Sequence, residues 1–169
     1  ISAQRYNADG TLNGSEFQVN TYTANSQSRP DITVLSDDGF IITWASAGQD
    51  GHQYGVFGQL YNADGTTRVE EFQINTYTEN SQSLSSVTAI HDGGFVVTWT
   101  SDRQDGDDDG IFGQRYNADG TQNGQEFQVN TYATEAQSWG DSATLLDGRF
   151  VVTWMSKGQD GDDYGIFAK

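Results

Sequence analysis

The chain has 169 residues, enough for one domain with a substantial core, and its 8 Lys and Arg against 24 Asp and Glu give a net charge of −16 with neutral histidines. This acidity excludes a protein that binds nucleic-acid phosphates through clustered cations, and the absence of cysteine excludes disulfides, thiolate metal sites and cysteine nucleophiles. No apolar run is long enough to span a bilayer and no secretory leader opens the sequence, so no membrane insertion is expected.

Internal repetition is the strongest signal in the sequence. Equivalent aromatic residues recur every 55 residues: Tyr6, Tyr61 and Tyr116; Phe17, Phe72 and Phe127; Trp44, Trp99 and Trp154. We therefore divide one repeat domain, residues 1–169, into units of approximately 1–55, 56–110 and 111–165. Residues 166–169 repeat the position of residues 1–4.

Each repeat is predicted to form four strands and no helix, because β-branched and aromatic residues gather in short runs between Asp-Gly turns. We number the strands by their place in one four-stranded sheet, and the chain begins at the third place. In chain order the first repeat therefore supplies a third strand at 1–6, a fourth strand at 17–22, a first strand at 32–36 and a second strand at 40–46. The equivalent strands lie at 56–61, 72–77, 87–91 and 95–101, and then at 111–116, 127–132, 143–147 and 150–156. The final residues, 166–169, begin another third strand.

The second strand predicts how the sheets pack. In Phe95 to Trp99, residues 95, 97 and 99 share one face and residues 96 and 98 share the other, so both faces are largely apolar. A sheet with one solvated face would carry polar residues at every second position. We therefore expect each four-stranded antiparallel unit to be covered on both faces, as in the stacked blades of a β-propeller.

Propellers usually have four to eight blades, so three repeats leave the architecture open. Two copies of the chain could complete a six-bladed ring by pairing their terminal strands, or the chain could be a segment of a longer array. The alternative all-β fold is a pseudo-threefold β-prism, in which three sheets enclose one core. Blade-like packing is the prediction that we favour.

The loops between the second and third strands are the most acidic points of the repeat. Asp105, Asp107 and Asp109 precede Gly110 with the D-x-D-x-D-G spacing typical of calcium loops, although no Glu stands at the twelfth position. The third repeat keeps only Asp160 and Asp162, and the first keeps only Asp50. These five aspartates of the second and third repeats are the candidate calcium ligands, and a solvated hairpin loop is the alternative.

Comparison of the repeats suggests where a partner binds, because positions that differ among them are free to face solvent or a ligand. Arg29, Leu84 and Trp139 occupy one equivalent position, and an exposed Trp139 would offer a stacking surface for a sugar ring or a protein contact. The alternative is that Trp139 covers the end of its own sheet. No catalytic constellation is recognisable, so the sequence favours a protein that is not an enzyme.

The pattern DGxFVVTWxSxGQDGDxxGIFGQRYNADGxxNGxEFQVNTYT, which covers the whole chain, resembles tandem repeats of large secreted or surface proteins of bacteria, often described with hemolysin-type (RTX-like) calcium-binding proteins and adhesins. The resemblance implies an extracellular, non-enzymatic protein that binds calcium. The glycine-rich nonapeptide of RTX β-rolls is absent, so calcium is carried over only to the two acidic loops. The expected function is an adhesive or carbohydrate-binding module with a glycan or cell-surface partner. The alternative is a structural block that self-associates through its terminal strands into a ring or fibre.

Overall fold

The computed structural model describes residues 1–169 and contains strands and turns but no helix, and therefore no helix that could cross a membrane. Thirteen strands follow one another along the chain. They are β1 (Ser2–Ala3), β2 (Phe17–Gln18), β3 (Gln27–Val34), β4 (Phe40–Ala47), β5 (Tyr54–Tyr61), β6 (Thr67–Gln73), β7 (Gln82–Ala89), β8 (Phe95–Asp102), β9 (Asp109–Tyr116), β10 (Phe127–Gln128), β11 (Gln137–Thr144), β12 (Phe150–Lys157) and β13 (Tyr164–Ala168).

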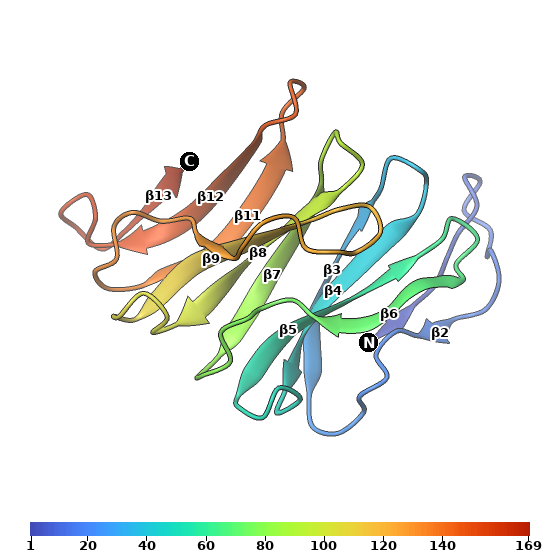
Figure 1. The fold of residues 1–169 in the computed structure, drawn as a ribbon, viewed down its shortest axis with the longest axis horizontal. Coiled ribbons are helices and arrows are strands. Elements are labelled where there is room, and N and C mark those ends of the chain that lie inside the picture. Colours follow the sequence, from blue (N-terminus) through green and yellow to red (C-terminus); the bar gives the residue numbers. More distant parts are fainter.

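Neighbouring strands pair antiparallel in three successive sheets, which we call blades. The first blade has the order β3-β4-β5-β6, the second contains β7, β8, β9 and β10 in sequence, and the third is β11-β12-β13. The pair β1-β2 stands before the first blade as a half-blade that holds only a third and a fourth strand. Figure 1 shows the blades fanned side by side, with the two termini at opposite ends of the arc. The all-β, propeller-like prediction is confirmed.

The hydrophobic core lies between blades. One cluster joins the first blade to the second, another joins the second to the third, and the remaining cluster lies between the half-blade and the first blade. Trp44 and Trp99 are fully buried in two of these clusters, and Trp154 is 5% exposed in the third. A β-prism would instead enclose one core inside three sheets, so the alternative fold is not the one observed.

Strand boundaries differ from the prediction at both edges of a blade. The first strand of each blade, which we call the inner strand, is β3, β7 or β11. In the first blade it begins at Gln27, five residues earlier than expected. A β-bulge at Arg29 and Pro30 lets the pairing continue across this stretch, although its composition is not typical of a strand. The outermost strands β2 and β10 pair over only two residues. The side chain of Asn130 explains the early end, since its Oδ1 accepts the hydrogen bond from Ile111 N at 2.8 Å that a backbone carbonyl would otherwise receive.

The second strand is covered on both faces in the first two blades only. Thr43 on β4 and Thr98 on β8 are fully buried, as two-sided packing requires. The equivalent Thr153 on β12 is exposed, because no other blade packs against that face of the third blade in the structure. The third blade therefore departs from the expectation that every repeat is shielded front and back.

Candidate binding pocket at the inner strands

The inner strands β3, β7 and β11 bring equivalent residues of the three repeats together. Between the first and second blades, Val87 N donates to Asp31 Oδ2 at 2.8 Å. Between the second and third, Ser86 Oγ donates to Asp141 Oδ1 at 2.8 Å. These contacts join positions that are about one repeat apart in the sequence, so the inner strands form one continuous surface near the axis of the arc.

A β-bulge interrupts each inner strand at the same place. Arg29, Leu84 and Trp139 have φ values of 56°, 55° and 58°, and each of them lies within the register shift of its strand. A left-handed backbone is uncommon for side chains of this size and is found where the surrounding structure holds it. Here the pairing of each inner strand with its second strand continues on both sides of the bulge, which holds the three backbones in the same conformation.

The three bulges line one open pocket of about 420 Å³, which we call the axial pocket. Its walls are three consecutive residues from each inner strand: Arg29, Pro30 and Asp31; Leu84, Ser85 and Ser86; Trp139, Gly140 and Asp141. The structure thus brings together all three residues that the comparison of repeats selected. Trp139 is 63% exposed, so it does not cover the end of its own sheet.

The lining combines one exposed indole with charged and hydroxyl groups. Arg29 Nη1 donates to Ser83 Oγ at 3.3 Å, which leaves other guanidinium donors free. Asp31 and Asp141 place two carboxylates in the same pocket, each anchored by hydrogen bonds from backbone amides. Such a mixture suits a ligand that has both an apolar face and several hydroxyl groups.

Sequence reasoning missed the polar half of this pocket. Asp31, Ser86 and Asp141 occupy equivalent positions two residues after the variable one, and two of the three repeats carry a carboxylate there. Variation between Asp and Ser at that position was a usable signal. That these side chains meet could not be read from the sequence, because it depends on how the blades fan out around their inner strands.

The acidic loop of the second repeat connects β8 to β9 and is a hairpin. Arg103 N donates to Asp108 O at 2.9 Å, and Gly106 takes a φ of 102° at the turn. Asp105 Oδ2 accepts hydrogen bonds from the side chains of Gln128 and Asn130 at 3.1 and 3.2 Å, which ties the loop to the region of β10.

The candidate calcium ligands are directed to different partners. Asp107 accepts a hydrogen bond from Glu135 N, while Asp109 belongs to β9 and pairs across the hairpin with Asp102. Burial raises the pKa of Asp109, and the charges of Asp102, Asp108 and Asp105 raise it further.

In the third repeat the same loop connects β12 to β13. Asp160 accepts a hydrogen bond from Asp162 N at 3.4 Å, and Asp162 accepts one from Asp163 N at 3.0 Å. No group of three or more His, Asp or Glu side chains is placed to hold a metal ion in either loop.

Comparisons with known proteins agree with the fold. No protein-family model and no curated protein matches the sequence. The structure is similar to an endo-arabinase from Bacteroides thetaiotaomicron, with a TM-score of 0.55 and 12% identity over 83% of this chain and 55% of that one. A thermostable family-43 glycoside hydrolase gives a TM-score of 0.53 and 9% identity over 99% of this chain and 65% of that one. A fucose lectin from Kordia zhangzhouensis, solved with methyl-fucoside, gives 0.47 and 10% identity over 82% and 97%.

The likeness to the two glycoside hydrolases establishes a propeller-like fold. The chain spans less than two thirds of the length of either glycoside hydrolase. The comparisons also correct the sequence-based expectation that this protein is not an enzyme, because the fold is shared with two glycoside hydrolases. The residues that line the axial pocket lie in different repeats, so their meeting cannot be read from a local sequence motif.

Proposed function

We propose that the axial pocket binds carbohydrate, and that the protein acts as a glycan-binding adhesion module of an extracellular protein. The observation that carries this proposal is the exposed indole of Trp139 beside Arg29, Asp31 and Asp141 in one pocket. A sugar ring presents an apolar face of C–H groups, which stacks on an aromatic ring, and hydroxyl groups, which pair with charged side chains.

Intrinsic fluorescence tests the proposal with little interference. Trp139 is 63% exposed, whereas Trp44, Trp99 and Trp154 are buried, so Trp139 is the tryptophan that a pocket ligand can shield from water. After a glycan array has identified candidate sugars, binding should shift the emission to shorter wavelength and protect one tryptophan from acrylamide quenching. Trp139→Ala should remove that signal and weaken binding by about tenfold or more, which corresponds to ~1.4 kcal/mol.

Tyr164 supplies a matched control. It is an aromatic residue that is 49% exposed and lies outside the axial pocket. Tyr164→Ala should leave sugar affinity unchanged, while Trp139→Phe should retain part of it because a smaller ring still stacks. Equal loss of binding in the Trp139 and Tyr164 variants, or binding of no sugar at all, would contradict the assignment of the pocket.

One observation favours a second candidate function, cleavage of the bound glycan. Glycoside hydrolysis generally needs two carboxyl groups on either side of the scissile bond, and Asp31 and Asp141 both line the pocket. Release of reducing sugar from a bound oligosaccharide, lost in Asp31→Asn and Asp141→Asn, would establish cleavage. Binding without release would leave recognition as the function.

Calcium binding stays a prediction for the acidic loops. Thermal melts with millimolar calcium and with chelator test it, because an ion that binds only the folded state must raise the midpoint. Asp107→Asn should reduce such a rise if the loop of the second repeat holds the ion. Identical midpoints in the two solutions would remove calcium from the description of this protein.

A further inference from the structure

Each blade buries one particular face against the blade that follows it, and we call this the forward face. In the first blade the forward face includes Ile41 on β4 and Val56 on β5, both fully buried. In the second blade it includes Val96 on β8 and Ile111 on β9, again fully buried. The covering residues come from the back of the next blade, where Trp99 and Trp154 contribute to the shared clusters.

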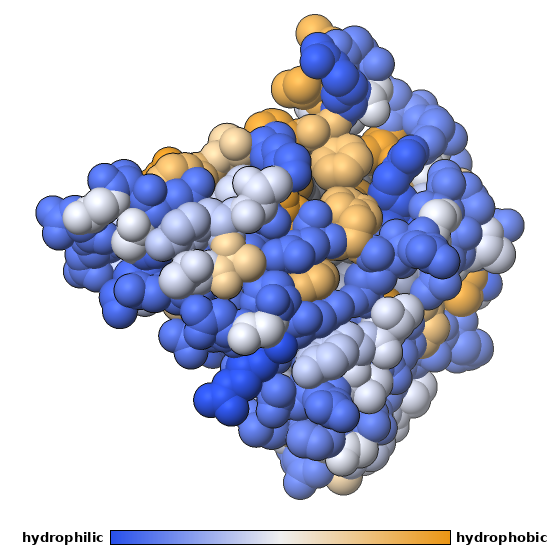
Figure 2. Space-filling view, turned by 60° about the vertical axis from the view of Figure 1, so that its left-hand side comes forward, coloured by the Kyte–Doolittle hydropathy of each residue, from blue (hydrophilic) through white to orange (hydrophobic).

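The forward face of the third blade has the same chemistry and no cover. Ile166 on β13 is 74% exposed, although its equivalents Val56 and Ile111 are completely buried. Val151 and Met155 on β12 are partly exposed beside it. Figure 2, which brings the C-terminal side forward, shows hydrophobic residues reaching the surface there.

The two ends of the arc lack complementary strands. The third blade has an inner, a second and a third strand but no fourth, whereas the half-blade β1-β2 has a third and a fourth strand but no inner pair. Because of this, Ile32 and Val34 on β3 are 57% and 62% exposed beside the half-blade. If the half-blade of one copy joined the third blade of another, together they would supply all four strands of a blade. The third position would then be filled twice, by β13 and by β1.

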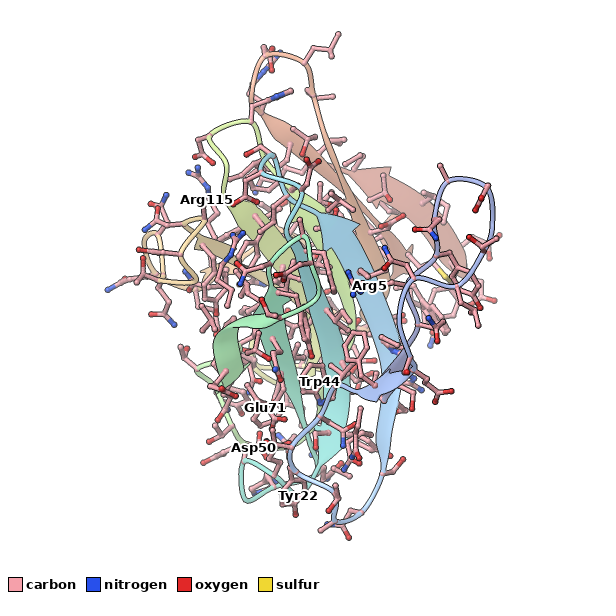
Figure 3. All side chains as sticks on the ribbon, turned by 90° about the vertical axis from the view of Figure 1, so that its right-hand side faces the viewer. Arg5, Tyr22, Trp44, Asp50, Glu71 and Arg115 are labelled. Carbon is pink, nitrogen blue, oxygen red and sulfur yellow. The ribbon has the colours of Figure 1, made fainter.

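A polar clamp closes two of the three internal junctions, namely those on either side of the first blade. Thr76 N and Oγ1 donate to Glu126 Oε2 at 2.7 and 2.8 Å, and Gln104 donates to the other oxygen of the same carboxylate. At the preceding junction Thr21 and Gln49 hold Glu71 in the same way. Figure 3 shows Glu71 at the same end of the first blade as Asp50 and Tyr22. In each clamp the Glu and the Gln belong to one blade, and the Thr follows the last strand of the blade before it. Both the Thr and the Gln donate hydrogen bonds to the Glu carboxylate.

The ends of the chain carry the separate parts of a third clamp. Thr131 and Gln159 are the equivalents of Thr76 and Gln104, but no Glu accepts a hydrogen bond from either of them. Glu16, the equivalent of Glu126, is exposed at the other end of the molecule and makes no hydrogen bond. Donors without their acceptor thus stand at one end, and the acceptor without its donors stands at the other.

We propose that a second copy of this chain docks head to tail on the third blade. Its β2 adds the missing fourth strand beside β13, and its Glu16 enters the clamp between Thr131 and Gln159 of the first copy. The covered surface includes Ile166, and the new junction repeats the packing between successive blades inside the molecule. Two copies joined at both ends would give six blades, within the usual range for closed propellers, and an open series would give a filament with the same junction.

The duplicated third strand makes docking a competition. Within one copy Ile1 N donates a hydrogen bond to Asn20 Oδ1. This bond is equivalent to the one that Ile111 N donates to Asn130 Oδ1 in the second blade. In the composite blade Ile166 N of the first copy is an alternative donor to Asn20 of the second. Docking therefore requires that β1 of the incoming copy give way to β13, which predicts slow, concentration-dependent association.

Sedimentation velocity on the full chain at increasing concentration tests the proposal. The wild-type chain should associate, and Ile166→Asp should remain monomeric because it places a charge on the forward face. Leu146→Asp is the matched control, since Leu146 is 98% exposed in the turn between β11 and β12 and lies outside that face. It should associate as the wild type does, and circular dichroism should show that all variants fold.

Mixing two variants distinguishes head-to-tail docking from other arrangements. Glu16→Lys, which removes the acceptor at the other end, should also remain monomeric. An equimolar mixture of Glu16→Lys and Ile166→Asp should form heterodimers, because each variant keeps one intact end. If Glu16→Lys alone associated as the wild type does, two forward faces would be pairing with each other. If the wild-type chain stayed monomeric at the highest concentration, a second copy would be excluded as the partner of the forward face. Either result overturns the proposal.

Discussion

Tyr61 and Tyr116 occupy equivalent positions on β5 and β9 and provide a matched test of packing between blades. Their rings stack on Phe40 and Phe95 in almost the same way, with centroids 4.9 and 5.0 Å apart and interplanar angles of 12° and 10°. Their hydroxyl groups differ. Tyr116 Oη donates to Ile74 O at 3.2 Å across the junction of the first two blades, whereas the buried Tyr61 hydroxyl has no partner.

Substitution by Phe should therefore have opposite effects at the two sites. Tyr116→Phe removes a buried hydrogen bond and leaves a carbonyl without that donor, so we expect the free energy of unfolding to fall by about 1–2 kcal/mol. Tyr61→Phe removes an unpaired polar group while keeping the ring, so we expect no loss and a gain of up to about 1 kcal/mol.

Urea denaturation followed by circular dichroism measures both differences, provided that the slope of unfolding free energy against urea stays the same. A companion spectrophotometric titration should find neither phenol ionised at ordinary alkaline pH. Burial raises the pKa of Tyr61 to about 12, with Glu70 and Glu71 adding to the effect, and burial also raises the pKa of Tyr116. Equal destabilisation by the two substitutions would refute the assignment of a junction hydrogen bond to Tyr116 alone.

Three further predictions address charge and backbone packing. The folded-state pKa of Asp109 is raised above 3.8, so ionisation of this carboxyl group destabilises the folded state. Asp109→Asn should therefore raise the melting midpoint at pH 7, and the difference should disappear below the pKa of the unfolded state. An equal difference at all pH values would contradict this prediction. Gly94→Ala should destabilise by about 2–4 kcal/mol, since a Cβ there would overlap a carbonyl oxygen of β9. Gly124→Ala should cost less, because its Cβ meets nothing within 4 Å and it adds only the backbone strain of a φ of 87°. The hydroxyl and then the backbone amide of Thr121 lower the pKa of Asp119, so its contribution to stability is present above pH 3.8 and is lost as the pH falls through the folded pKa; Thr121→Val should move that pKa upward in an NMR titration.

Much of the blade structure was readable from the sequence because local pattern and global packing agree. The alternation from Phe95 to Trp99 predicted a strand buried on both sides, and the structure completely buries Trp99 on one face and Val96 on the other. The predicted Asp-Gly turns are also present, for example at residues 117–120, where Gly120 N donates to Asn117 O at 3.0 Å. In these segments the residues that define the turn or strand are also those that make its contacts.

Prediction and structure differ where the burial of a residue depends on whether another blade packs against it. Thr153 and Thr98 belong to the same sequence pattern, and one is exposed while the other is fully buried because only the second has a blade in front of it. Ile111 and Ile166 likewise occupy one position of the repeat, yet Ile111 is completely buried and Ile166 is 74% exposed. Spacing along the chain cannot report either effect.

The positive φ shared by Arg29, Leu84 and Trp139 has a consequence for how such proteins diversify. A position whose backbone is held by pairing on both sides can accept a cation, an aliphatic chain or an indole without disturbing the packed interior. Each repeat therefore contributes one interchangeable determinant to a shared cavity. Shuffling or duplicating repeats would alter what the cavity recognises while leaving the scaffold intact.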